Sequence, residues 1–245
     1  VRGAAAAIVI AQALPCMYLM ARLAQRVRID LLAPGTLSQL STMFGPSSFL
    51  MLRTLGNTGT YAFATSVVSQ AGAVHAAAHQ VCFQLWMATS LTADSLAVAA
   101  QALAAQALGA GDKARARAAV ERCVVLAAAL GLAMAVAVGT CRHALARLFS
   151  TDPQVLGLIA SVMPLLVVTQ PINALAFVWD GALFAVGGFR YASVAMVACA
   201  VPAVAAVAVG ARQADPALTL VWVWVGLGAL MLGRAASIMA PYLLK

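Results

Sequence analysis

Long apolar runs constrain the fold of this chain more than any other feature of its sequence. Of the 245 residues, 64% are hydrophobic and only 9% are charged, whereas soluble domains carry about 25% charged residues. So few charged side chains are unable to cover a soluble domain of this size. An apolar run of about 20 residues can cross the hydrocarbon of a bilayer as a helix. The sequence therefore predicts an all-α polytopic membrane protein.

Seven of the runs are long enough to span a membrane. They are 1–21, 45–69, 76–108, 118–141, 154–186, 191–211 and 217–240. The longest stretch that does not span, 22–44, contains Pro34 and Gly35 and is predicted to be a linker. Thr151 or Asp152, directly before Pro153, is the predicted N-cap of the fifth run.

The chain begins at Val1, inside the first apolar run, rather than at a methionine. The apolar core of a secretory signal has only about 7 to 15 residues, so the first run is too long to be one. We therefore expect a severed membrane helix and a chain that is a fragment or an incomplete gene model.

Basic residues lie mainly between the apolar runs, as they do in loops of membrane proteins. One predicted side carries nine of them: Arg22, Arg26, Arg28, Lys113, Arg115, Arg117, Arg122, Arg190 and Lys245. The other carries four: Arg2, Arg142, Arg147 and Arg212. The first side is therefore predicted to be cytoplasmic. Plasma membrane, plastid envelope and vacuole all stay open. Basic and aromatic residues are not interleaved in the pattern that would indicate a nucleic-acid partner.

Four charged residues lie clearly within the runs, where each costs several kcal/mol unless paired or hydrated. They are Arg53, Asp94, Asp180 and Arg234. Asp94 belongs to a stripe that recurs every three or four residues along 76–108. Its members are Gln80, Gln84, Met87, Leu91, Asp94, Val98 and Gln101. The stripe is predicted to line a wet cavity, and hydrogen bonding between helices is the alternative.

Asp180 follows Asn173 by seven residues, so both lie on one face of the run 154–186. Pro171 and Gly181 permit a bend there, a device that transporters use around ion and substrate sites. Asp180 is a candidate for such a site, or else a structural partner of Arg53, Arg190 or Arg234. Arg53, one turn before Asn57, is predicted to be a paired structural or gating residue. The same holds for Arg234, which lies near a helix end.

Other chemistry is not indicated by the sequence. His75 and His79 have a metal-ligand spacing, but no third ligand is evident. The five cysteines are scattered, without C-x-x-C pairs. We find no nucleotide-binding phosphate loop and no catalytic Ser/His/Asp or Cys/His spacing. We therefore predict no metal, no cofactor and no enzymatic activity.

Three segments, 76–102, 111–113 and 170–181, resemble the multidrug and toxic compound extrusion (MATE) family, more narrowly its DinF-like branch in plants and algae. The resemblance covers about residues 40–240. It implies twelve helices in two six-helix lobes. Residues 1–21 would then end the N-terminal lobe, 22–44 would be the cytoplasmic inter-lobe linker, and 45–245 would form the C-terminal lobe. The missing N-terminal lobe would be a partner of this chain.

The resemblance also implies a function: export of organic solutes, such as xenobiotics, citrate or phenolics, in exchange for protons or sodium ions. It places Asp94 on the cavity wall, where its protonation is the predicted coupling step. Many relatives carry an acid in the run 45–69, and some carry one near Asn173, but this chain has neither. Coupling would then fall to Asp94, to Asp180 or to the missing lobe. The alternatives are a flippase for lipid-linked substrates and a nonfunctional truncated product.

Overall fold

The structure, a computed structural model, describes residues 2–25 and 36–243. Its helices are α1 (Arg2–Ala24), α2 (Thr36–Gln70), α3 (Ala73–Gly109), α4 (Lys113–Phe149), α5 (Pro153–Ala185), α6 (Phe189–Gly210) and α7 (Pro216–Leu243). Within the described residues, each predicted run corresponds to one of these helices, with the runs 154–186 and 191–211 ending one residue beyond α5 and α6, and no strand occurs there. The all-α fold is therefore confirmed. Predictions for residues 26–35, including Arg26 and Arg28, and for Lys245 lie outside the described residues.

Six of the described helices are long and apolar enough to cross a membrane, and α2 is not among them. The difference lies in its composition, because α2 is rich in Ser and Thr and contains Arg53 and Asn57. α2 also begins at Thr36, so it includes residues 36–44, which we predicted to be linker. The helix-breaking residues Pro34 and Gly35 precede this start. The chain is an integral membrane protein. One helix, α2, is more polar than we expected of a membrane span.

The chain divides into two units, Val1–Gly45 and Pro46–Lys245. In the first unit, α1 exposes the described side chains along its whole length, including Ile8 and Met17. An apolar helix with such a surface suits a lipid environment. The assignment of 1–21 to an N-terminal lobe, of 22–44 to a linker and of 45–245 to a C-terminal lobe stays a prediction.

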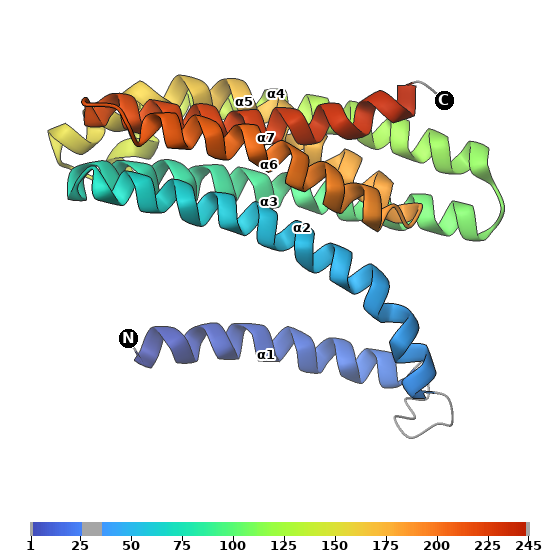
Figure 1. Ribbon diagram of the computed structural model, residues 1–245. Helices are drawn as coiled ribbons and strands as arrows, with labels where there is room; N and C mark the ends of the chain where they lie inside the picture. The colour runs from blue at the N-terminus through green and yellow to red at the C-terminus, as the bar shows by residue number, and fades with distance from the viewer. Residues whose placement is uncertain (1, 26–35, 244–245) are drawn as a thin grey trace. The chain divides into compact units, whose positions relative to one another are not determined.

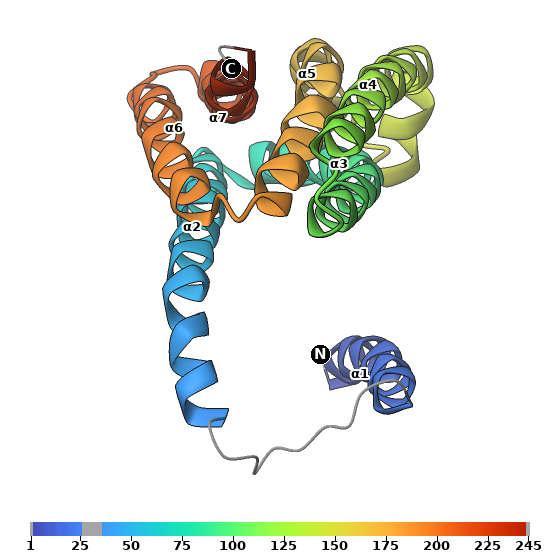
Figure 2. The same cartoon turned by 90° about the vertical axis from the view of Figure 1, so that its right-hand side faces the viewer.

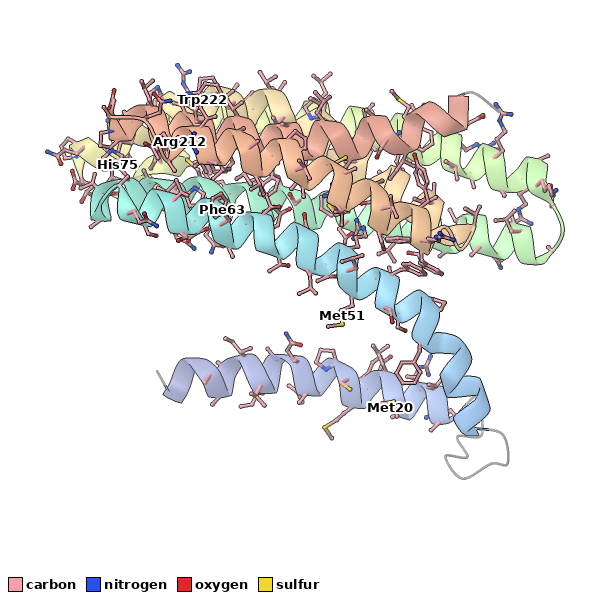
Figure 3. The ribbon with its side chains drawn as sticks, viewed as in Figure 1. Met20, Met51, Phe63, His75, Arg212 and Trp222 are labelled. Atoms are coloured by element: carbon pink, nitrogen blue, oxygen red, sulfur yellow. The ribbon has the colours of Figure 1, made fainter. Side chains whose placement is uncertain are left out.

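In the second unit, α5 packs against α3, α4 and α7, while α6 packs against α7 (Figures 1 and 2). α2 joins α6 through the Ser193 hydroxyl, which donates to the Phe49 carbonyl. Turns 110–112 and 186–188 lie at one end of the bundle, and turns 71–72, 150–152 and 211–215 lie at the other (Figure 1). Figure 3 shows His75 and Arg212 toward this second end. The alternation of loops assumed in the orientation prediction therefore occurs in this unit.

Small residues allow the helices of this unit to pack closely. A Cβ at Gly181 of α5 would lie 2.3 Å from the carbonyl oxygen of Ala97 on α3, and one at Gly131 of α4 would lie 2.6 Å from Cα of Pro171. The buried face of α3 consists largely of alanine. Close backbone contact of this kind is typical of membrane helices. Gly181 therefore serves helix packing, and α5 continues as a helix through Pro171.

The predicted helix start before Pro153 is also confirmed. The Asp152 carboxylate accepts a hydrogen bond of 2.8 Å from the backbone N–H of Gln154. Asp112 caps α4 in the same way, accepting from the backbone N–H of Arg115 at 2.8 Å. Each cap satisfies an N–H that has no partner within its own helix.

Candidate functional site

A cavity of about 140 Å³ lies between α2, α3, α5 and α7. Its wall contains Arg234 and six other residues that the sequence predicts as site, structural or gating residues. The six are Arg53, Asn57, Asp94, Gln101, Asp180 and Gly181. Residues from four helices thus meet at one place. We call this space the charged cavity.

Asp180 binds two arginines at one wall of the charged cavity. Its Oδ2 accepts a hydrogen bond from Nη2 of Arg53 on α2 and another from Nη2 of Arg234 on α7. Asp180 is 5% exposed and Arg234 is 4% exposed. Buried charges persist only when they are paired. The sequence left Asp180 as either a site residue or a structural partner of an arginine. In the structure it pairs with Arg53 and Arg234, whereas Arg190 is exposed.

Aromatic rings of α5 cover both guanidinium groups. Arg53 lies over the ring of Phe184 and Arg234 over the ring of Phe177, each with 5.1 Å between the guanidinium carbon and the ring centroid. Phe177, Asp180 and Phe184 are three and four residues apart, so they share one face of α5. This face therefore supplies both the anion and the rings that stabilise the two cations.

Several polar atoms of the charged cavity have no hydrogen-bond partner among the described residues. They include Oδ1 of Asn57 and the Nε atoms of Arg53 and Arg234, all of them buried. A buried polar atom without a partner costs about 1–3 kcal/mol. These atoms leave the wall able to donate to and accept from a polar ligand.

Asp94 on α3 is partly buried and lines the same cavity. Within residues 2–25 and 36–243, Asp94 takes part in none of the ion pairs. Gln101, two turns further along α3, also lines the cavity. Asp94 therefore shares the cavity with Arg53, Asp180 and Arg234 without being one of the ion-paired residues.

The N-terminal part of the stripe, from Gln80 to Leu91, is not part of the wall of the charged cavity. Gln80 and Gln84 are exposed and are not part of its wall. The reason is length, because 21 helical residues separate Gln80 from Gln101, or about 31 Å along the axis. A cavity of about 140 Å³ lacks the length to include both. The structure therefore places only the C-terminal part of the stripe, from Asp94 to Gln101, in the wall of the charged cavity.

Asn173 lies in the packing between helices rather than in the charged cavity. Its Nδ2 donates a hydrogen bond of 2.7 Å to Oγ of Ser90, which joins α5 to α3. Asn173 is 1% exposed. Gln170, one turn earlier, is equally buried, and neither atom of its amide has a partner in the described part of the chain. Sequence reasoning did not select Gln170, since an isolated glutamine in an apolar helix gives no sign of its partners.

The sequence predicts Arg234 to be a paired structural or gating residue, and in the structure Arg234 is buried and pairs with Asp180. A usable signal was the scarcity of charge in the spans. Two buried arginines need an acid nearby, and Asp94 and Asp180 are the acids that the spans clearly offer.

His75 and His79 have different surroundings in the structure. His75 is partly exposed, while His79 is 1% exposed and its Nε2 lies 3.3 Å from Oγ1 of Thr65. His79 also packs against Trp224, with ring centroids 5.8 Å apart. No group of three metal-ligating side chains occurs among the residues described. His79 therefore contributes to the packing of α2, α3 and α7.

Comparison with known proteins gives a consistent result. The MatE family model matches residues 50–209. Protein DETOXIFICATION 42 of Arabidopsis thaliana is 39% identical over 202 residues, which are 82% of this chain and 39% of that protein. Protein DETOXIFICATION 43 of the same plant is 35% identical over 237 residues, 96% of this chain and 44% of that protein. The chain thus spans less than half the length of the curated relatives it matches.

A solved structure has the same fold. It is described as a MOP superfamily transporter from Pyrococcus furiosus whose binding pocket has reverse polarity. It superposes with a TM-score of 0.70 over 78% of this chain and 42% of the other, at 19% identity. Together with the plant relatives and the family match, which covers more than half of the residues, this fold places the chain: it belongs to the MatE family of membrane transporters.

Proposed function

We propose that this chain is part of a secondary antiporter that exports organic solutes in exchange for protons or sodium ions. The observation that carries the proposal is the charged cavity, where a buried Arg53–Asp180–Arg234 cluster lies beside Asp94. Ionisable groups are expensive inside a membrane and are typical of ion and substrate pathways. Family membership supports transport, and the charges support the coupling.

Asp94 is the proposed coupling group. Two arginines and Asp180 leave one positive charge in the wall, which an ionised Asp94 balances. Protonation of Asp94 would remove that balance and leave the cavity positive. Such a change in charge can shift an equilibrium between two helix arrangements. Asp180 suits this task less well, because its carboxylate already binds both arginines.

The charge of the solute decides the direction of this coupling. A cationic solute and a proton would compete for Asp94, and competition for one site yields exchange. An organic acid would instead be attracted by Arg53 and Arg234, and a proton on Asp94 would strengthen that attraction. By electrostatics alone, exchange at Asp94 favours cationic solutes, while an acid such as citrate needs coupling through a helix rearrangement.

Efflux from vesicles tests the proposal. Full-length protein in liposomes would be loaded with a cationic dye or with labelled citrate, and a proton or sodium gradient would be imposed. We expect the gradient to accelerate efflux of at least one solute and an ionophore that collapses the gradient to abolish the acceleration. If neither a proton gradient nor a sodium gradient changed the efflux rate of any solute tried, coupled antiport would be rejected.

A flippase for lipid-linked substrates is the second candidate, and the two cavity arginines favour it because phosphate groups need cations. Assays in the same liposomes separate the candidates. A flippase would move a fluorescent pyrophosphate-linked lipid between leaflets, whereas the antiporter would move the soluble solute and leave the lipid in place.

A further inference from the structure

A second and larger cavity lies at the end of the bundle that carries turns 110–112 and 186–188. Its volume is about 610 Å³, and α3, α4, α5 and α7 form most of its wall. The interior is apolar, with Ala104, Val120, Trp179 and Ile238 forming one buried cluster. We call this space the end cavity. It shares no lining residue with the charged cavity.

The first two turns of α4 give the end cavity a charged mouth and an apolar interior. Lys113, Ala116, Arg117 and Val120 all line it, and their spacing of three and four residues places them on one face. The two cations are exposed, while Ala116 and Val120 are 6% exposed. Positive side chains therefore lie at the start of α4, and apolar side chains lie about 10 Å further along the helix axis.

The cations at the mouth, Lys113 and Arg117, are exposed and so are accessible to a ligand. Arg117 pairs with Glu121 at 2.9 Å, but both side chains are more than half exposed, at 67% and 54%. Exposed pairs of this kind contribute little, about 0–1 kcal/mol. An anion that engages both Lys113 and Arg117 competes readily with such a pair.

An amphiphile with an anionic head matches this wall. A soluble anion would leave the apolar interior unused, and a neutral lipid would leave the two cations unused. The volume falls within the range of about 300–1,000 Å³ that is typical of small-molecule sites. Tyr191, also in the wall, is a residue type enriched at the level of lipid headgroups. We propose that the end cavity binds an acidic phospholipid, with its headgroup at Lys113 and Arg117 and an acyl chain against Trp179.

The predicted orientation agrees with this occupant. The end of the bundle with Lys113 and Arg117 is the one that the distribution of basic residues assigns to the cytoplasm. Acidic phospholipids are concentrated in the cytoplasmic leaflet, and basic pockets between membrane helices on that side bind their headgroups.

Lipid binding to purified full-length protein tests the proposal. Native mass spectrometry would compare phosphatidylglycerol with phosphatidylcholine carrying the same acyl chains. We expect a retained lipid that prefers phosphatidylglycerol. The double variant Lys113→Gln/Arg117→Gln should lower that affinity by about fivefold for each cation removed. The matched control Arg115→Gln/Arg122→Gln removes the same charge from exposed positions of α4 outside the cavity wall, and it should bind normally.

A third variant tests the apolar part. Ala182→Leu adds volume from α5 without changing charge, and it should weaken phosphatidylglycerol binding while the thermal unfolding temperature stays near that of the parent. Equal binding of the two lipids, equal loss in the control double variant, or normal binding by a folded Ala182→Leu would each overturn the proposal. Displacement of the lipid by glycerol phosphate alone would do so too, since it would indicate a soluble anion.

Discussion

Single residues of the charged cavity are coupled through one carboxylate. Asp180 accepts from Arg53 and from Arg234, so three helices depend on one side chain. The two arginines are not equivalent, because 18% of the Arg53 side chain is exposed against 4% of the Arg234 side chain. This asymmetry decides how costly each deletion is.

We predict that Asp180→Asn is the most destabilising change in the cluster, because it removes the carboxylate that binds both Arg53 and Arg234. Loss of one partner from a buried ion pair costs about 3–5 kcal/mol. Arg53→Gln should cost much less, since Arg234 and Asp180 remain as a neutral pair. Thermal unfolding of the full-length protein in detergent measures the order.

The exposed Arg190→Gln serves as the control for loss of an arginine and should unfold as the parent does. If Arg53→Gln and Asp180→Asn unfolded at the same temperature, the cluster would not be organised around Asp180.

The sequence alone identified the charged residues of this site and offered Arg53, Arg190 and Arg234 as alternative partners of Asp180, but it gave no basis for choosing among them. Asp94, Asp180, Arg53 and Arg234 stand out because charge inside a membrane run is rare and expensive. The pairing depends on how distant helices pack, because Arg53 and Arg234 lie 127 and 54 residues from Asp180 in the sequence. No local spacing encodes such contacts, so only the requirement for pairing was available.

At the scale of helices, close packing of α3 and α5 fixes the charged cavity. The approach of Gly181 to the Ala97 carbonyl leaves no room for a side chain, and both residues line the cavity. Along the same contact, Asn173 donates to Ser90. The cavity therefore depends on backbone contact as well as on charge.

Gly181→Ala should separate α5 from α3, because the new Cβ would lie 2.3 Å from the carbonyl oxygen of Ala97, a backbone atom of α3 that is unable to move aside as a flexible side chain would. We expect a loss of about 1–3 kcal/mol, as for other overpacked sites. The measurement is thermal unfolding, compared with Gly157→Ala on the same helix.

Gly157 lies beside open space, since a Cβ there would meet no atom within 4 Å. Alanine at this position should therefore be neutral or stabilise by about 0.5–1 kcal/mol through helix propensity. Equal effects of the two substitutions would show that α3 and α5 are not in close contact.

Helix positions were predictable, but helix faces were only partly so. Length and apolarity located every helix, and Asp152 with Pro153 located a start. On α3, alanine occurs on both the buried and the exposed faces, so polarity gives little contrast between them. By its spacing the predicted stripe follows one side of α3, and it extends beyond the charged cavity because α3 has 37 residues. Periodicity identifies a face, and the neighbouring helices determine which part of it is used.

At the scale of the whole molecule, the described chain holds a six-helix unit whose loops alternate between two ends. Its formal net charge of +8 arises from basic residues gathered mainly on the predicted cytoplasmic side. The relatives are more than twice as long as the segments that match this chain.

Thiol labelling in intact cells tests the orientation. In full-length protein, Ala110→Cys and Thr151→Cys place a thiol in turns at opposite ends of the bundle. A membrane-impermeant maleimide should label the Thr151→Cys variant from outside and the Ala110→Cys variant only after permeabilisation. The reverse pattern would place the basic end, and with it the end cavity, outside the cytoplasm.

The central claim, that Asp94 couples ion entry to solute export, is tested most directly by gradient-driven efflux from liposomes containing Asp94→Asn protein. Asparagine keeps the shape of the side chain but is unable to take up a proton, so we expect the acceleration by the gradient to fall about tenfold or more. Glu121→Gln, a neutralised acid on the exposed face of α4, should keep the full acceleration. Unchanged acceleration in folded Asp94→Asn protein would contradict the claim and move the coupling elsewhere.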